Sequence, residues 1–435
     1  GNTSGIVTAT VSSDTASNLN TNLSNASASD SLTLTISGVS ATAVDINALD
    51  GKTSVNVDAS SLTDITGSLS DLNTIYDSNG ITGLGDENVS ISDTGTITAS
   101  NMNDFLSPLE TSGTITLNGS GNLNITLGTG ENLDLSGVSN SLSGSLTIVD
   151  SSGGNTITGT SVGETVETTV SNLTASDSID GAGGNDTLSF TNSGSIDSDD
   201  IVDGISNFET LNLSNGNDTI NFDDTIDFNN FIGEFGTISD AGGTDSLSFG
   251  SSAVSGDLDF SKLGNFENLN LSSVADTITL SGDESTNING LGGDDNFTLD
   301  FTNIDDFTID GGSGTSDTVD LNGTSNSIAA DEEFGHALSF TNIENLDISG
   351  LNLVTADGDT EFEFTDALIK SWTGETNGNL TLSLTSTQVD LIKFTDTISG
   401  TERNEYDTVT TTTSIEDNTT YDLGDSTLTI DLIDV

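Results

Sequence analysis

One short pattern recurs through the middle of this 435-residue chain and constrains its fold more than any other feature. An acidic residue is followed by apolar residues two and four positions later, with polar residues between them. Alternation with a period of two is typical of a β-strand that buries one face. The copies are residues 186–190, 218–222, 245–249, 276–280, 295–299 and 317–321. The pattern therefore predicts many short, half-buried strands.

Glycine-rich turns precede four of these copies, at residues 180–185, 240–244, 289–294 and 310–314. Glycine adopts positive φ easily, so a glycine-rich turn can direct its backbone carbonyls inward. Asp adds a short carboxylate, and calcium takes about six to eight oxygens from carboxylates and carbonyls. A glycine turn, an Asp and a strand in this order predict a calcium-loaded β-solenoid. The alternative is an Asp-Gly turn that caps the strand without an ion.

The charge balance excludes several classes of partner. The chain has 5 Lys and Arg residues against 69 Asp and Glu residues, a formal net charge of -64. No nucleic-acid partner is expected, because phosphate binding requires basic residues, and adsorption to an anionic membrane is disfavoured for the same reason. Divalent cations are the natural counter-charge. Disorder is the competing interpretation, but about a quarter of the residues are Leu, Ile, Val or Phe, above the roughly 20% typical of disordered chains.

Cysteine is absent and His336 is the single histidine, so the sequence offers no disulfide, no thiolate site and no histidine-rich zinc site. No nucleophile motif accompanies His336, and we expect no enzyme activity. No apolar run is long enough for a transmembrane helix, so no membrane insertion is expected. The chain begins at Gly1 without an initiator Met or a signal peptide. We therefore expect a processed form, a fragment, or cargo exported through a signal at its other end.

Changes in residue composition and repeat pattern divide the chain into three expected regions. Residues 1–110 form a β-rich N-terminal segment with a weak internal repeat, in which 45–49 is echoed at 101–105. Residues 111–350 form the solenoid with its calcium-binding turns. Residues 351–435 form a C-terminal cap or assembly domain that covers the last open strand.

Individual elements are also expected outside the solenoid. Helical spacing of apolar residues predicts a helix over 68–76, with Ser68 as its N-cap, and another over 364–372. Alternating residues predict strands over 380–384 and 388–392. Five Phe residues are expected to form one stacked ladder inside the solenoid: Phe190, Phe222, Phe249, Phe297 and Phe340.

A second phrase, Asn-apolar-Glu-x-Leu-x-apolar-Ser, occurs at residues 207–214, 265–272 and 342–349. Its acids, Glu209, Glu267 and Glu344, could bind a cation or could simply hydrogen-bond the neighbouring strand. The interval from Asp218 to Asp245 recurs from Asp317 to Glu344, as expected for acids on neighbouring coils of a solenoid.

The glycine turns resemble the RTX or haemolysin-type calcium-binding repeat proteins, whose nonapeptide is Gly-Gly-x-Gly-x-Asp-x-apolar-x. Ala182 replaces the second Gly in one copy, and Leu291 is out of pattern in another. The likeness covers roughly residues 150–350 and implies calcium as the cofactor, type I secretion and a bacterial extracellular or cell-surface location. Together with the turn pattern it gives the predicted metal ligands Asp180, Gly181, Gly184, Asp186, Asp218, Asp240, Asp245, Gly290, Asp294, Asp295, Asp310, Gly312 and Asp317.

This chain also departs from that family, in which glycine turns follow one another in tandem. Its isolated turns favour a few scattered calcium sites over a continuous row. The abundance of Ser, Thr, Asn and Asp is similar to that of bacterial surface-layer proteins.

The expected fold is therefore all-β: a calcium-binding β-solenoid, β-roll-like or β-helix-like, with a β-rich N-terminal segment and a C-terminal cap. The expected function is structural, as a secreted subunit of a calcium-dependent surface layer or extracellular filament. Its main partner would be other copies of itself, with cell-surface polysaccharide as a further candidate. The alternatives are the spacer of a large RTX-type adhesin and the non-catalytic part of an RTX exoenzyme.

Overall fold

The computed structural model describes residues 5–106, 111–239, 242–259, 266–281, 286–300, 308–329, 339–354, 362–396, 401–403 and 415–433. The chain divides into two compact units. The first comprises Gly1–Thr191 and Asp203–Leu211, and the second comprises Asn192–Val202 and Asn212–Val435. Most strands in both units are short and pair in parallel, so the expected β-rich fold is confirmed.

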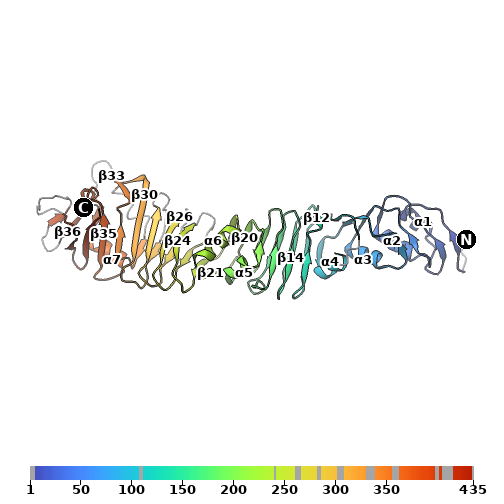
Figure 1. Ribbon diagram of the computed structural model, residues 1–435, viewed down its shortest axis with the longest axis horizontal. Coiled ribbons are helices and arrows are strands. Elements are labelled where there is room, and N and C mark those ends of the chain that lie inside the picture. The colour runs from blue at the N-terminus through green and yellow to red at the C-terminus, as the bar shows by residue number, and fades with distance from the viewer. Residues whose placement is uncertain are drawn as a thin grey trace. The chain divides into compact units, whose positions relative to one another are not determined.

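Three parallel sheets run through the first unit, and their strands lie side by side in Figure 1. One contains β3 (Ser40–Thr42), β5 (Asp64–Gly67), β7 (Asn88–Ile91), β9 (Ile115–Leu117) and β12 (Val138–Asn140). Another contains β11 (Asn132–Asp134), β14 (Thr156–Thr158), β16 (Ser178–Asp180) and β19 (Ile205–Ser206). The third contains β8 (Gly95–Thr98), β10 (Leu123–Thr126), β13 (Leu146–Val149), β15 (Thr165–Thr168), β17 (Thr187–Phe190) and β20 (Thr210–Asn212). Two pairs complete the unit, β1 (Thr8–Thr10) with β2 (Ser31–Thr33) and β4 (Val57–Asp58) with β6 (Ile81–Thr82).

The register of these sheets places like residues beside like. Ile125 of β10 pairs with Ile148 of β13, and Ile148 pairs with Val166 of β15, which pairs with Leu188 of β17. All four side chains are buried. A shift of one residue would turn this apolar row towards solvent, so the alternating pattern seen in the sequence fixes the pairing.

Four short helices line the N-terminal part of the first unit: α1 (Ala16–Asn22), α2 (Ala43–Asp50), α3 (Leu69–Asp77) and α4 (Ala99–Leu106). An Asn in each helix reaches the next repeat. Asn20 Nδ2 donates to the carbonyl of Asp45 at 2.8 Å, Asn47 to that of Asp71 at 3.2 Å, Asn73 to that of Asn101 at 3.1 Å, and Asn103 to that of Asn132 at 2.7 Å. The predicted repeat of 45–49 at 101–105 therefore has a further copy between them, at 71–75, which the sequence did not predict. The helix expected over 68–76 is confirmed as α3, with Ser68 as its N-cap.

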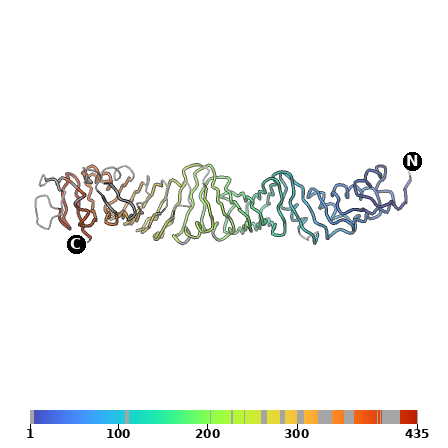
Figure 2. The backbone as a smooth tube through the Cα atoms, turned by 90° about the horizontal axis from the view of Figure 1, so that it is seen from above, coloured from blue at the N-terminus to red at the C-terminus, as the bar shows by residue number. Residues whose placement is uncertain are grey.

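Two long sheets dominate the second unit. One contains β18 (Ser195–Asp197), β21 (Thr219–Phe222), β23 (Ser246–Phe249), β25 (Asn268–Asn270), β27 (Asn287–Asn289), β29 (Thr308–Asp310) and β31 (Ser339–Thr341). The other contains β24 (Ser255–Asp259), β26 (Thr277–Ser281), β28 (Asn296–Asp300), β30 (Thr318–Ala329), β32 (Asn345–Asp347), β35 (Asn379–Leu384), β39 (Thr427–Leu432) and the antiparallel edge strand β38 (Thr419–Asp422). Figure 2 shows successive segments of this unit running alongside one another.

Smaller elements complete the second unit. The strands are β22 (Thr237–Ser239), β33 (Leu351–Val354), β34 (Phe362–Phe364), β36 (Ile392–Asp396) and β37 (Thr401–Arg403). The helices are α5 (Ser198–Val202), α6 (Thr225–Glu234) and α7 (Asp366–Thr373). The helix expected over 364–372 is thus confirmed, whereas the strand expected over 388–392 is wrong because Val389–Leu391 is a 3-10 helix. Buried Gln388 favours this turn, since its side chain accepts from Thr385 N and donates to the Ile348 and Leu351 carbonyls.

Aromatic residues fill much of the core of the second unit. Phe222 and Phe249 pair in register, with ring centroids 5.4 Å apart, and α6 adds Phe228 and Phe231 against Phe222. Phe340 instead packs against Trp372. The five Phe residues expected inside the fold are all buried, but they do not form one ladder, because they belong to three different sheets.

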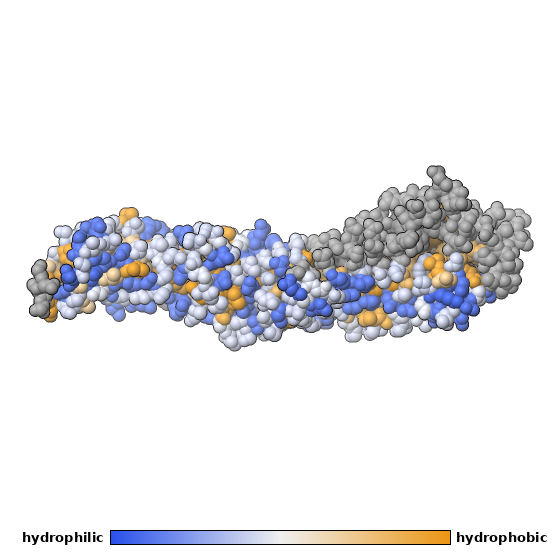
Figure 3. All heavy atoms as spheres, turned by 180° about the vertical axis from the view of Figure 1, so that it is seen from behind, coloured by the Kyte–Doolittle hydropathy of each residue, from blue (hydrophilic) through white to orange (hydrophobic). Residues whose placement is uncertain are grey.

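The surface carries no broad apolar area on the coloured part of the face shown in Figure 3. Exposed large apolar residues include the adjacent Ile6 and Val7 and, further along the chain, Val162, Val274 and Leu291. Among the described residues, no helix is both long and apolar enough to cross a membrane.

Replacement of Ser68 by Ala tests the local control of helix α3. Ser68 Oγ accepts from the N–H of Asp71 and donates to its carboxylate at 2.7 Å. Loss of an N-cap typically costs about 1 kcal/mol. We expect Ser68→Ala to lower the free energy of unfolding by about that amount, measured by urea denaturation. Ser70→Ala, at an exposed position inside the same helix, serves as the control and should change little. Equal losses in the two variants would contradict the capping role.

Candidate functional site

Acidic side chains are buried at the corners where the chain enters its strands. The residue immediately before the strand is Asp186 at β17, Asp218 at β21, Asp276 at β26, Asp295 at β28 and Asp317 at β30, and none is more than 1% exposed. Burial of a carboxylate is costly unless it is paired or hydrogen-bonded. Basic partners are scarce: among the described residues, ion pairs form only at Lys370, with Asp366 and Asp425. Hydrogen bonds therefore have to stabilise these carboxylates.

The acids hydrogen-bond to one another's backbone in rows that we call carboxylate ladders. In each step the N–H of one acid donates to the carboxylate of the next, which lies 19 to 27 residues later. Ladder 1 is Glu164–Asp186–Glu209, with N···O distances of 2.8 and 2.7 Å. Ladder 2 is Asp218–Asp245–Glu267, with distances of 2.5 and 2.7 Å. Ladder 3 is Asp276–Asp295–Asp317–Glu344, with distances of 2.7, 2.7 and 2.9 Å.

Each ladder ends at the Glu of the recurring Asn-apolar-Glu phrase. Glu209 accepts from Asp186 N, and the N–H groups of Glu209 and Thr210 both donate to the Asp186 carbonyl at 3.1 Å. Glu267 and Glu344 make the same exchange with Asp245 and Asp317. The interpretation of these Glu residues as hydrogen-bond partners of the neighbouring strand is therefore confirmed.

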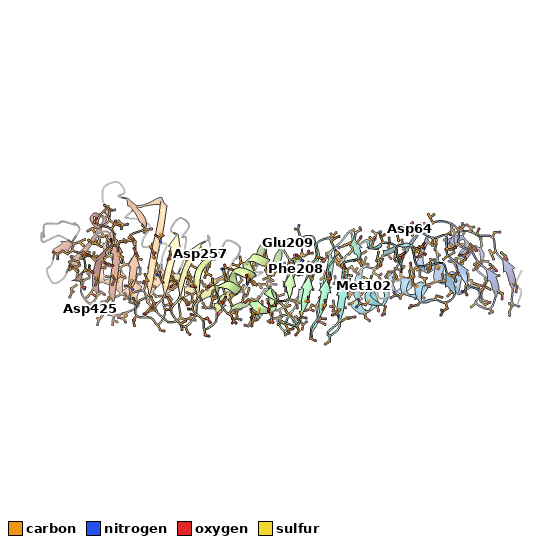
Figure 4. The ribbon with its side chains drawn as sticks, viewed as in Figure 1. Asp64, Met102, Phe208, Glu209, Asp257 and Asp425 are labelled. Atoms are coloured by element: carbon orange, nitrogen blue, oxygen red, sulfur yellow. The ribbon has the colours of Figure 1, made fainter. Side chains whose placement is uncertain are left out.

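The residues before the terminal Glu anchor the same corner. Phe208, labelled beside Glu209 in Figure 4, is buried in the core. Asn207 has a φ of 59° and Asn342 a φ of 56°. Their side chains donate to the Oδ1 atoms of Asp180 and Asp310 at 2.7 and 2.6 Å. Asn tolerates this left-handed conformation better than most residues, which explains its place in the phrase.

One kind of corner, the hydroxyl corner, supplies its own donors to the buried acid. Asp218 accepts from Ser214 N at 3.1 Å and Ser214 Oγ at 2.9 Å. Asp276 accepts from Ser272 N at 2.9 Å and Ser272 Oγ at 2.8 Å. Glu164 receives the same pair of bonds from Thr160. In every case the hydroxyl residue lies four positions before the acid.

The other kind, the glycine corner, leaves one carboxylate oxygen without a donor. Asp186, Asp295 and Asp317 each use Oδ1 in their ladder, and their buried Oδ2 atoms have no hydrogen-bond partner in the described part of the chain. Backbone carbonyls crowd these oxygens. A β-carbon on Gly290 would overlap both Asp295 Oδ2 and the Gly311 carbonyl oxygen. The same holds at Gly311 for Asp317 Oδ2 and the Asn342 carbonyl, and at Gly181 for Asp186 Oδ2 and the Asn207 carbonyl.

Two glycine corners place a non-glycine residue where the backbone is left-handed. Ala182 has a φ of 67° and Leu291 a φ of 63°, whereas the third corner has Gly312 there with a φ of 92°. Hydrogen bonds from Gly183 N to the Gly181 carbonyl and from Gly292 N to the Gly290 carbonyl close the tight turns. Ala182 and Leu291 are two of the positions at which the chain departs from the glycine pattern of the RTX repeat.

Burial makes several ladder carboxylates easy to protonate, and it raises the pKa of Glu164 to about 7 although Thr160 donates to both of its oxygens. Burial, assisted by the neighbouring charges of Asp276 and Asp317, raises the pKa of Asp295 to about 7. Burial also raises the pKa of Asp186 to about 6, assisted by the charge of Glu209, and that of Asp317 to about 6, assisted by Glu344. A proton or a cation beside Oδ2 would relieve the cost of burial and the repulsion from the neighbouring acids.

The glycine corners have the oxygen chemistry that calcium prefers. Each brings a buried carboxylate oxygen close to a carbonyl from the following segment of chain, and hard oxygen ligands of these two types suit calcium. Among the described residues no group of three His, Cys, Asp or Glu side chains is placed to hold a metal. A cation at such a corner would therefore take most of its ligands from backbone carbonyls and water.

The predicted ligands fall into three groups. The first group lies at glycine corners and consists of Gly181 with Asp186, Gly290 with Asp295, and Gly312 with Asp317. Gly184 packs against Val162 and Gly163 of the preceding corner. Asp180, Asp294 and Asp310 instead accept from backbone N–H groups of their own or a neighbouring turn. Asp218 already has protein donors on both oxygens, Asp245 continues ladder 2, and Asp240 lies outside the described residues.

The hydroxyl corners were not predicted from the sequence. Glu164 and Asp276 were not among the predicted ligands, nor were their partners Thr160 and Ser272 recognised. The signal was present as a Ser or Thr four residues before a strand-entering acid. The carbonyls of Asn207, Gly311 and Asn342 carry no signal in side-chain patterns, because any residue could supply them.

The raised pKa values predict how stability depends on pH in the presence of a chelator. Asp186, Asp295 and Asp317 bind a proton more tightly when folded, so their contribution is complete below the ordinary carboxyl pKa and is lost as the pH rises through about 6 to 7. We expect the urea midpoint to fall between about pH 5 and pH 8.

Asparagine variants separate this effect from general charge repulsion. Asp295→Asn keeps an acceptor for Asp276 N–H but cannot ionise, so it should flatten the pH dependence and exceed the wild type in stability at the alkaline end. Asp257→Asn, at an exposed position of β24, removes the same charge and should leave the slope almost unchanged. Identical slopes in the two variants would rule out the buried carboxylate as the cause.

Leu291→Gly tests the strained turn. Leu291 is 51% exposed, so little packing is lost, while a left-handed conformation costs a residue with a β-carbon about 1 to 2 kcal/mol. We expect a gain of about 1 kcal/mol in the free energy of unfolding, because the greater freedom of glycine in the unfolded chain offsets part of the relief. Leu291→Ala keeps the β-carbon and should gain nothing. A thermal melting temperature that does not rise in the Gly variant alone would contradict this.

No protein-family model matches this chain, and no curated protein or solved structure matches it. Its function therefore has to be inferred from the strand register, the carboxylate ladders and the two kinds of corner.

Proposed function

We propose that this chain is a calcium-binding β-solenoid that serves as a secreted structural protein, a subunit of a bacterial surface layer or extracellular filament. The observation that carries the proposal is the set of buried Oδ2 atoms of Asp186, Asp295 and Asp317, each of which lies near a backbone carbonyl and has no donor among the described residues. Such an arrangement is unfavourable unless a cation or a proton lies beside each oxygen. At neutral pH in a calcium-rich medium, calcium fits the oxygen ligands best.

The strand register supports the solenoid. Each sheet grows by parallel pairing of a strand with one about a coil later, as in Thr219 with Ser246 and Ser246 with Asn268. Parallel pairing of such short strands requires the chain to return to the same side after every coil, and coils that contact only their neighbours define a solenoid. The likeness of the glycine turns to the RTX repeat supports the same fold.

Calcium would supply the positive charge that the sequence lacks. Each ion would be held by a carboxylate and a carbonyl: Asp295 with Gly311, Asp317 with Asn342, and Asp186 with Asn207. Extracellular calcium modules bind at about 10⁻⁴ to 10⁻³ M, so at millimolar calcium each site contributes roughly 0.4 to 1.4 kcal/mol by mass action. Several sites of this strength are significant for a domain of marginal stability.

The net negative charge of the chain, as well as its fold, supports a role as an assembling structural subunit. A net charge of -64 opposes contact between copies until cations screen or bridge the acidic faces. Calcium would then control both the order of the coils and the association of subunits. Secretion would place the chain where calcium is abundant.

A spacer in a large RTX-type adhesin is the second candidate. It is favoured by the repetition of the same ladder-ending exchange at Glu209, Glu267 and Glu344, since a solenoid built from such repeats can be extended without limit.

Electron microscopy of the purified chain tests the structural role. With millimolar calcium we expect a lattice or filaments, which excess chelator disperses and renewed calcium restores. Magnesium at the same concentration is the control, because it prefers rigid octahedral sites that retain water. Assembly that persists in excess chelator would falsify the proposal, whereas calcium-stabilised but separate monomers would favour the spacer.

A further inference from the structure

The ladder acids differ in how many donors the protein gives them. Asp276 receives three hydrogen bonds, from Val254 N at 2.6 Å, Ser272 N at 2.9 Å and Ser272 Oγ at 2.8 Å. Asp218 also receives three, from Gly194 N, Ser214 N and Ser214 Oγ. In contrast, Asp295 Oδ2 has no donor among the described residues, although the side chain is equally buried.

We propose that the hydroxyl corners take the place of a bound cation, so that only the glycine corners depend on calcium for their order. The inference rests on the proposed calcium binding and specifies where it acts. Coils at Asp186, Asp295 and Asp317 need the ion, and coils at Asp218 and Asp276 hold without it.

The physical basis is the saturation of the carboxylate by protein donors. A Ser amide and hydroxyl four residues before the acid bring two partial positive charges to its carboxylate, and hydrogen bonds to an ionised acceptor are the stronger kind. Together with the amide of Gly194 or Val254, these Ser donors occupy both oxygens of Asp218 and Asp276. A cation at these corners would have to compete with donors that are already in place.

Glycine corners offer the opposite arrangement. The tight turns at Ala182 and Leu291 hold no hydroxyl side chain, and glycine at 181, 290 and 311 lets a carbonyl approach where a β-carbon would otherwise lie. The carbonyl oxygen and the carboxylate Oδ2 both lie within 3.0 Å of the position that this β-carbon would take. The carbonyl belongs to the following coil, so an ion between the two oxygens would join adjacent coils.

Asp276 and Asp295 provide a matched pair inside one ladder. They are consecutive, their strands β26 and β28 pair in register, and the Asp276 N–H donates to Asp295. They share strand context and burial but differ in the kind of corner. Any difference in their response to calcium therefore reports the corner itself.

Hydrogen–deuterium exchange of the full chain, read by mass spectrometry with calcium and with chelator, tests the proposal. We expect calcium to slow exchange at least tenfold in peptides covering 181–190, 290–299 and 311–321. Peptides covering 214–222 and 272–281 should exchange at similar rates in both conditions. The measurement needs no mutation, so it does not depend on a variant folding.

Two variants sharpen the test. Asp295→Asn should abolish the effect of calcium on peptides covering 290–299, while Asp276→Asn should weaken protection at 272–281 equally with and without calcium and leave the effect at 290–299 in place. An equal calcium response at both kinds of corner would overturn the inference but leave calcium binding intact. No calcium response at any corner would overturn both.

Discussion

The hydrogen bond from the N–H of one buried acid to the carboxylate of the next is the interaction on which the corners depend. It gives every ladder acid after the first a donor without any Lys or Arg, which the chain almost entirely lacks. Because the donor is the backbone of the preceding acid, strand register and carboxylate position are fixed together. A slip of the sheet would break the ladder, and a lost acid would leave an unpaired N–H at the corner.

Differences between corners follow from a few residues. Ser214 and Ser272 saturate the acid that follows them, and glycine at 181, 290 and 311 admits a carbonyl instead. The Asn-apolar-Glu phrase stabilises the corner in two ways. Its Glu ends a ladder, and the side chain of its left-handed Asn donates a hydrogen bond to an Asp of the preceding turn. An acidic composition that suggests disorder is thus compatible with order, since every ladder acid accepts at least one hydrogen bond from a backbone N–H.

The sequence predicted part of this organisation well. Alternation identified the strands around Asp186, Asp295 and Asp317, helical spacing identified α3 and α7, and the equal intervals from Asp218 to Asp245 and from Asp317 to Glu344 did mark acids that are hydrogen-bonded across the sheet. It could not show that Asp218 and Asp295 differ, because that depends on whether a Ser hydroxyl four residues earlier reaches the carboxylate. Nor could it foresee the 3-10 helix at Val389–Leu391, where the buried Gln388 amide overrides strand propensity.

Each carboxylate ladder ends at a Glu, whose side chain is one methylene longer than that of Asp, and this ending limits the repulsion between the stacked carboxylates. Like charges stacked at strand spacing, about 4.8 Å, repel increasingly as the row lengthens. Each row in this chain stops after two or three acids at a Glu that is more exposed than the Asp residues before it, and the following row begins on another sheet. Because each row is short, the repulsion between stacked carboxylates does not build up along the chain. A strongly anionic chain can therefore add further coils without an increasing electrostatic cost for each new coil.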